Sequence, residues 1–371
     1  MPSRAALRRS AVVARKEVLH ILRDPATLLI ALIVPIVELF LLGYGINTNV
    51  RRIRTVVLDQ ARTEESQSLL DSFRTSDDFA LSAEVFSEEG LNRAIIAGEA
   101  RVGIKIPADY SRRVQAGETA TVLILVDGSE SSVASEAVNV SNALLLREAL
   151  NRVLGERTLP VAARPRILFN PDTRSANFFL PGLLVLLVQI MAVVMTANAV
   201  VREKENGTLE QLFMLPLRSA ELIAGKLFPY LVLALVEFCV IALLMRVVFA
   251  VPIHGSFFTL LAVGVPFTLT MLGLGLLIST SVSTRDAAGQ MAMSTIIPSI
   301  FLSGYIFPID SMPRLFWWLA QFVPTTWLID ASRSVILRGA GWPQLWKHFL
   351  VLWGMAIPML VLSTQRFRKR V

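Results

Sequence analysis

The chain has 371 residues, of which 54% are hydrophobic and 18% are charged, and its mean hydropathy is +0.58. An ordinary globular chain is less apolar, so this composition excludes a chain built only of soluble domains. The formal net charge of +7 does not indicate nucleic-acid binding, because the basic residues gather beside apolar segments. The single cysteine, Cys239, excludes an intrachain disulfide.

Residues 1–25 predict an amphipathic helix at the cytoplasmic face of a membrane. Arginines and Lys16 occupy one arc of the helix, and anionic headgroups favour each such cation by about 1 kcal/mol. The neighbouring apolar stripe consists of Leu7, Ala11, Ala14, Val18, Ile21 and Leu22. Asp24 and Pro25 then turn the chain into the first membrane span. The alternative is a basic tail that does not fold.

Six apolar segments have the length of membrane-spanning helices. Segments of about 18 to 25 residues match the roughly 30 Å hydrocarbon core when they are helical. They are 26–46, Phe178–Val201, Leu227–Val251, Phe257–Ser281, Met291–Phe307 and Leu345–Leu362. Most basic residues outside the long polar stretch lie before the first span, in the loop 202–226 or at the C-terminus. The positive-inside rule therefore places both termini in the cytoplasm.

The polar stretch 47–177 predicts a small extracytoplasmic α/β domain. Expected strands are Arg54–Gln60, Phe79–Phe86, Arg101–Pro107 and Thr121–Asp127, and expected helices are Glu64–Phe73, Glu88–Ala97, Ala108–Ala116 and Ser131–Leu154. Runs of Val, Ile and Leu between turn residues are typical of strands, and their alternation with helices is typical of an α/β fold. This stretch contains no His and no Cys, so we expect no metal site and no catalytic residues in it.

The loop 202–226 contains the sharpest local signal. Thr208 and Gln211 have the spacing of a capping box, and Pro216 ends the helix that they begin. A short helix with an apolar side can dock another protein, although it could also be a tight connector. The residues of this predicted coupling helix and partner contact are Glu205, Gly207, Thr208, Leu209, Glu210, Gln211, Leu212, Phe213 and Pro216.

Three polar residues lie within apolar segments and are candidates for a substrate path: Glu38, Gln189 and Glu237. A charge at the centre of a membrane helix costs roughly 2.5–3.5 kcal/mol, so such residues usually face a bundle interior. The alternative is that each one only hydrogen-bonds a neighbouring helix. A re-entrant region is expected at 298–330, where Pro298 and Pro308 bracket non-helical backbone. Its outer-gate candidates are Pro298, Gly304, Phe307 and Pro308.

Several motifs resemble those of ABC-2 type exporter permeases, in the bacterial branch with a large periplasmic domain after the first span. These are GTLEQL at 207–212, LPLR at 215–218, ELIAGKLFPY at 221–230, SANFFLPG at 175–182, LSGYIFP at 302–308 and VDGS at 126–129. The resemblance implies an inner-membrane permease with six transmembrane helices (the type V exporter fold). It also implies dimerisation with an identical or paralogous chain. A separate ATP-binding cassette subunit, which binds ATP and Mg, would dock on the loop helix.

We therefore expect a non-enzymatic permease subunit that moves a hydrophobic or amphipathic, drug-like or lipid-like substrate outward. The chain lacks a phosphate-binding loop, since Gly225-Lys226 is followed by Leu227. We expect no cofactor and no nucleic acid on this chain; expected partners besides the ATPase are membrane lipid and, as a candidate, a periplasmic adaptor. The alternatives are an ion-coupled secondary transporter that uses Glu38 and Glu237, and a receptor that uses the α/β domain as its sensor.

Overall fold

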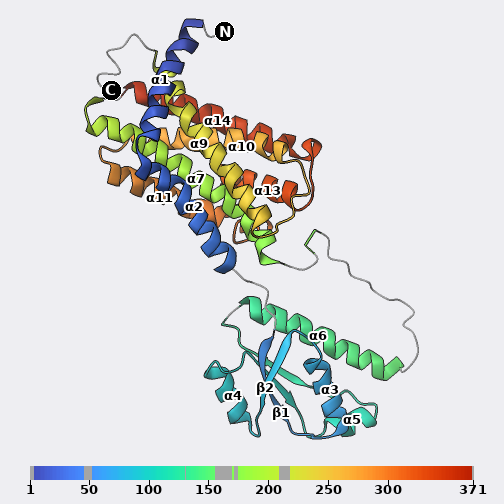
Figure 1. Cartoon of the computed structure of the whole chain (residues 1–371). Coiled ribbons are helices and arrows are strands. Elements are labelled where there is room, and N and C mark those ends of the chain that lie inside the picture. Colours follow the sequence, from blue (N-terminus) through green and yellow to red (C-terminus); the bar gives the residue numbers. More distant parts are fainter. Residues whose placement is uncertain are drawn as a thin grey trace. The chain divides into compact units, whose positions relative to one another are not determined.

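The computed structural model describes residues 4–45, 52–129, 131–154, 169–170, 174–208 and 218–369 (Figure 1). The chain divides into a helical unit, Met1–Ile46 with Ile167–Val371, and an α/β unit, Asn47–Arg166. The α/β unit ends at Arg166, before the predicted residue 177, because the segment ahead of helix α7 (Ser175–Glu205) is attached to the helical unit. There the Asn177 side chain donates a hydrogen bond to Asn170 (2.8 Å), and Arg174 donates to the carbonyl of Phe249 (3.0 Å).

The α/β unit contains one sheet of four strands in the order β2-β1-β3-β4. The strands are β1 (Ile53–Asp59), β2 (Phe79–Glu84), β3 (Val102–Ile106) and β4 (Leu123–Val126). The central strand β1 pairs in parallel with β2 and β3, and β4 is antiparallel to β3. All four predicted strands are confirmed, with ends that differ by a few residues.

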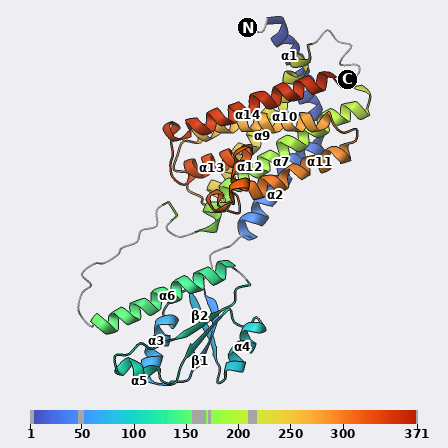
Figure 2. The same cartoon turned by 180° about the vertical axis from the view of Figure 1, so that it is seen from behind.

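Helices cover both faces of this sheet. Figure 2 shows α3 (Glu64–Arg74) and α5 (Tyr110–Gln115) on one side and α4 (Glu88–Ile96) on the other. The period of two in β1 sends Val57 into the core with α3, while Val56 and Leu58 pack with α4. The long helix α6 (Ser131–Leu154) contributes Val133 and Ala137 to the first core. The predicted helices are therefore confirmed.

A charged turn joins β4 to α6. Asp127 accepts a hydrogen bond from the backbone N–H of Ser129 (3.0 Å) and forms an ion pair with Arg101. These hydrogen bonds, that of the Ser129 N–H first, lower the pKa of Asp127 from 3.8 to about 2. Its contribution to folding is therefore fully present above the ordinary pKa and is lost as the pH falls through about 2. This geometry explains the Asp at position 127 of the Asp-Gly-Ser sequence.

The helical unit consists of ten short and long helices among the described residues. They are α1 (Arg4–Leu22), α2 (Pro25–Gly45), α7 (Ser175–Glu205), α9 (Ser219–Val247), α10 (Phe257–Ser279), α11 (Arg285–Leu302), η1 (Ile309–Ser311), α12 (Arg314–Gln321), α13 (Pro324–Ile336) and α14 (Trp342–Lys369). Four of them, α7, α9, α10 and α14, are long and apolar enough to cross a membrane. A shorter apolar helix, Leu32–Gly45, lies within α2. The six-span count stays a prediction.

Helix α7 is the central helix of this unit. Its apolar segment is 72% buried, against 67% in α10, 44% in α9 and 17% in α14. It packs against α9, α10, α11 and α13, as Figure 1 shows. Small residues permit close approach; a Cβ on Gly275 of α10 would lie 2.6 Å from the Val193 carbonyl oxygen of α7. Helix α9, which follows the loop 206–218, and helices α11 and α13, which flank the turns after Leu302, are thus all packed on α7.

The expected break at Pro298 is wrong. Helix α11 runs through Pro298 to Leu302, and the backbone leaves the helix only at Ser303, before Gly304 adopts a φ of +78°. Proline is tolerated inside helices of membrane proteins because neighbouring groups compensate for the lost donor. Five other described helices of this chain also continue through a proline, namely Pro35, Pro181, Pro229, Pro266 and Pro358.

Helix α1 packs closely against α9 at Gly225, where a Cβ would lie 2.6 Å from the Ser10 carbonyl oxygen and 2.7 Å from the Val13 Cβ. We predict that Gly225→Ala displaces α1 and lowers the unfolding free energy by about 1–3 kcal/mol, as overpacking does. Thermal unfolding of the purified chain, with the rate of tryptic cleavage inside residues 4–23, measures this effect. The control is Gly354→Ala in α14, whose Cβ would meet nothing within 4 Å. Equal behaviour of both variants would contradict the packing.

Candidate functional site

The buried face of α1 shares only Ile21 with the predicted apolar stripe among the residues whose burial is described. Its buried side chains are Val13, Glu17 and Ile21, whereas Val18 and Leu22 of the stripe are exposed on the chain. The difference arises because Glu17 finds a cationic partner in α9 and is therefore buried despite its charge. The exposed apolar residues remain suited to lipid, as an amphipathic interface helix requires.

A charged cluster, which we define as Lys16, Glu17, Glu203 and Lys226, joins three helices at the base of the loop. Lys226 of α9 donates to Glu17 of α1 (3.0 Å) and forms an ion pair with Glu203 of α7. Lys16 also donates to Glu203 (2.9 Å). Glu17, Glu203 and Lys226 are no more than 4% exposed. Buried charges persist only when they are paired, so the cluster fixes α1, α7 and α9 to one another.

Flanking ion pairs extend this connection. Arg202 pairs with Asp24 in the turn between α1 and α2 (3.0 Å), and Arg9 pairs with Glu221 at the start of α9 (3.5 Å). On the other side Arg285, at the start of α11, pairs with Glu205 at the end of α7 (2.7 Å). Four helix ends are therefore held beside the loop that follows Glu205.

The predicted coupling helix begins at the edge of the described chain. Glu205 is engaged by Arg285, Gly207 has a φ of +65° that favours glycine, and the Thr208 hydroxyl donates to the Glu203 carbonyl (3.2 Å). The remaining coupling residues, Leu209, Glu210, Gln211, Leu212, Phe213 and Pro216, lie outside the described residues. The capping box and the helix itself therefore stay predictions.

Gln189 forms a buried polar group inside the helical unit. Its amide donates to the Ser299 hydroxyl of α11 (2.8 Å) and accepts from the Thr325 hydroxyl of α13 (2.6 Å). Gln189 and Ser299 line a cavity of about 360 Å³ that three methionines also border, Met271, Met355 and Met359. This is a volume and a lining typical of sites for apolar small molecules, and methionine adapts to varied shapes.

Glu38 and Glu237 are not among the residues that line that cavity. Glu237 in α9 is 1% exposed, and neither of its carboxylate oxygens has a hydrogen-bond partner among the described residues. Glu38 of α2 is half-buried and acts electrostatically on Glu237. The structure thus brings these two predicted path residues near each other.

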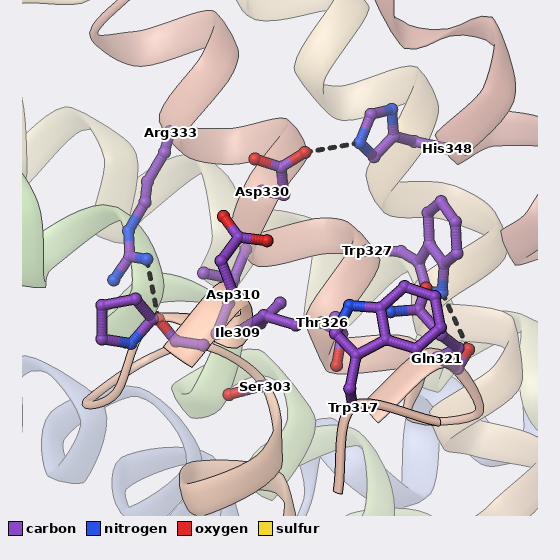
Figure 3. Close-up of a pocket in the computed structure, with 13 residues that line it drawn as sticks. Ser303, Ile309, Asp310, Trp317, Gln321, Thr326, Trp327, Asp330, Arg333 and His348 are labelled. Atoms are coloured by element: carbon purple, nitrogen blue, oxygen red, sulfur yellow. Dashed lines mark hydrogen bonds and ion pairs between the residues drawn. The ribbon is translucent and has the colours of Figure 1, made fainter. Parts of the chain in front are cut away.

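A third polar region lies around the turns that follow α11 (Figure 3). Arg333 of α13 donates to the carbonyls of Gly304 (2.8 Å) and Tyr305 (3.1 Å) and stacks over the Phe178 ring (3.9 Å). It therefore fixes the shape of the turn that contains the outer-gate candidate Gly304. Of the other candidates, Phe307 and Pro308 are exposed, and Pro308 precedes η1.

The same region encloses a cavity of about 410 Å³. Arg333 lies on one side of it and Trp317 and Trp327 on the other (Figure 3). His348 of α14 bonds Asp330 of α13 (2.8 Å), which joins two walls of the cavity.

Sequence reasoning missed the charged cluster and this outer cavity. None of the predicted site residues belongs to the charged cluster, and of the cavity's lining residues only Gly304 and Pro308 were among the predicted ones. Lys226 directly precedes the predicted span Leu227–Val251, a position at which a basic residue is ordinary, so the local sequence does not mark it as buried. Its partner Glu17 is 209 residues away, so no local pattern could identify it.

Four described helices that are long and apolar enough to cross a membrane, packed around buried polar groups, are typical of a multi-pass membrane protein. The chain belongs to the ABC-2 family of transporter proteins, whose family model matches residues 25–364. The resemblance seen in the sequence motifs is thus confirmed. Membership implies an ATPase partner subunit.

Individual relatives extend over nearly the full chain. The chain is 29% identical over 369 residues, 98% of each protein, to a probable multidrug ABC transporter permease of Escherichia coli, YbhS. It is 26% identical over 351 residues, 94% of this chain and 93% of the relative, to a second such permease of that organism, YbhR. The linearmycin resistance permease protein LnrN of Bacillus subtilis is 22% identical over 357 residues, 87% of this chain and 90% of the relative.

The charged cluster predicts the effect of removing its central cation. Lys226→Met leaves Glu17 and Glu203 buried with less compensation, which should cost about 3–5 kcal/mol of unfolding free energy. Denaturant or thermal unfolding of the purified chain measures the loss. Lys204→Met is the matched control, because Lys204 is exposed and its hydrogen bond within the described part of the chain goes to the Val282 carbonyl. If Lys226→Met were as stable as the control, the cluster would not hold the helices together.

Proposed function

We propose that this chain is the permease subunit of an ATP-binding cassette exporter, and that its ATP is hydrolysed, with Mg, by a separate subunit. The observation that carries the proposal is the charged cluster with its flanking ion pairs. It attaches both ends of the loop 206–218, through α7 and α9, to α1 and α11. A force applied to this loop by a docked ATPase is then passed to several membrane helices rather than absorbed in a flexible connector.

The proposed substrate is hydrophobic or amphipathic, drug-like or lipid-like. The cavity of about 360 Å³ beside Gln189 supports this, because its methionines suit apolar bodies and its amide and hydroxyls suit a few polar groups. The naming of relatives as multidrug and linearmycin resistance permeases points the same way. We propose Gln189, which lines this cavity, as a residue of the substrate path, with Glu38 and Glu237 as further candidates for the same path.

We further propose a six-span chain in the bacterial inner membrane, with both termini in the cytoplasm and the α/β unit outside. Dimerisation with a second permease chain, identical or paralogous, would complete the transporter, and a periplasmic adaptor on the α/β unit is a further candidate partner. The ion-coupled alternative keeps one supporting observation, the unpartnered carboxylate of Glu237. Transport that persists without any cassette ATPase would favour that alternative.

The docking contact is tested with Leu212→Asp combined with Phe213→Ala. Loss of buried anchors at an interface commonly costs about 2 kcal/mol or more, enough to reduce occupancy of a modest complex more than tenfold. We expect loss of ATPase co-purification and of export at normal membrane levels. Phe86→Ala is the control, since Phe86 is an exposed aromatic residue of the α/β unit. Wild-type ATPase recovery in the double variant would leave the loop as a connector.

The orientation is tested by cysteine labelling in a Cys239→Ala background. Ser68→Cys lies at an exposed position of α3 and should react with an impermeant thiol reagent added to intact cells. Ala220→Cys, exposed at the start of α9, should react only after the membrane is opened. The reverse pattern would invert the proposed topology.

A further inference from the structure

A cavity of about 240 Å³ lies where the turn between α1 and α2 meets α7, α9 and the start of α11. All of these elements belong to the helical unit. Its apolar lining residues are Ile21, Val194, Met195, Ala199 and Leu233, and its polar lining residues are Asp24, Asn198, Arg202, Tyr230 and Arg285. The cavity therefore combines an apolar wall with a polar end.

Two buried polar atoms of these lining residues lack a partner. Neither the side-chain oxygen of Asn198 nor Nε of Arg202 forms a hydrogen bond with any described residue. One atom is an acceptor and the other a donor. Leaving either unpaired is costly, so the cavity favours an occupant that donates one hydrogen bond and accepts another.

The charges around the cavity are balanced. Arg202 pairs with Asp24 (3.0 Å) and also contacts the His20 ring (3.4 Å), while Arg285 pairs with Glu205 (2.7 Å). The two guanidinium groups and the two carboxylates sum to zero. A balanced site with separated charges fits a zwitterion better than a simple anion.

The position of the polar end matches that of a lipid headgroup. Arg202 lies near the end of α7, three residues before Glu205, and the apolar lining residue Met195 lies seven residues deeper in the same helix. At 1.5 Å per residue this places the apolar wall about 10 Å farther into the membrane.

We propose that this cavity binds a phospholipid with a primary ammonium group, of the phosphatidylethanolamine type. Its phosphate accepts from Arg202 and Arg285, its ammonium donates to Asn198 and Asp24, and an acyl chain lies along Val194, Met195 and Leu233. The bound leaflet is the one on the α1 side, which is cytoplasmic in the proposed orientation. The inference requires only that α7 and α9 span a membrane, so it does not depend on coupling to an ATPase.

A comparison of phosphatidylethanolamine with phosphatidylcholine, both with the same acyl chains, tests whether the N–H groups of the ammonium are required. Both are zwitterions, but the choline ammonium has no N–H and cannot satisfy Asn198. Native mass spectrometry of the delipidated full chain, titrated with each lipid, should show about tenfold tighter binding of phosphatidylethanolamine, the factor expected for about one hydrogen bond. Glycerophosphoethanolamine, the soluble headgroup alone, should not compete, because it lacks the acyl chain. Equal binding of both lipids, or full competition by the free headgroup, would overturn the proposal.

Substitutions at Asn198 test whether the preference for phosphatidylethanolamine arises in this cavity. Asn198→Leu removes the acceptor at similar volume and should abolish the preference, whereas Asn198→Asp keeps an acceptor and should retain it. Asn206→Leu, at the exposed end of the same helix, is the control and should behave as the wild type. Preference that survives in Asn198→Leu, or that disappears in a folded Asn198→Asp, would contradict the assignment.

Discussion

The structure of the helical unit depends on the need to pair a buried lysine. Lys226 is 3% exposed and lies between the carboxylates of Glu17 and Glu203. Because a buried charge without a partner costs several kcal/mol, α1 and α7 must remain against α9 for the lysine to stay charged. The N-terminal helix is consequently an integral part of the membrane unit, and the loop 206–218 starts and ends on helices that share the same cluster.

Helix α7 contributes a residue to the charged cluster, to two of the cavities discussed above and to the contact with the outer turn. Glu203 belongs to the charged cluster, Asn198 to the lipid cavity, Gln189 to the methionine-lined cavity, and Gly182 contacts Tyr305 in the outer turn. Since α7 is the most buried of the long helices, a shift at one end displaces neighbours at several levels. This continuity gives the proposed exporter a direct mechanical route from loop to cavity.

Local patterns predicted most elements, because strands and helices of the α/β unit are determined by short-range periodicity. Val56, Val57 and Leu58 in β1 illustrate this, since they pack alternately on the two faces. Long-range pairing was not predictable, because nothing in the sequence near Lys226 reveals Glu17. The apolar stripe predicted for α1 also left out Glu17, which is buried because Lys226 pairs with it. The break expected at Pro298 failed because tertiary packing maintains α11 through the proline. The apolar segment around Gln189 marks this residue in the sequence, but its partners Ser299 and Thr325 could be found only from the fold.

A double-mutant cycle on Glu17 and Lys226 tests the central claim most directly. Glu17→Gln, Lys226→Met and the double variant are unfolded in denaturant under identical conditions. The double variant leaves Lys16 and Glu203 as a balanced pair, so its loss should be smaller than the sum of the single losses by about 1–3 kcal/mol. Losses that add to within about 0.5 kcal/mol would show that the two residues do not interact, and would contradict the account.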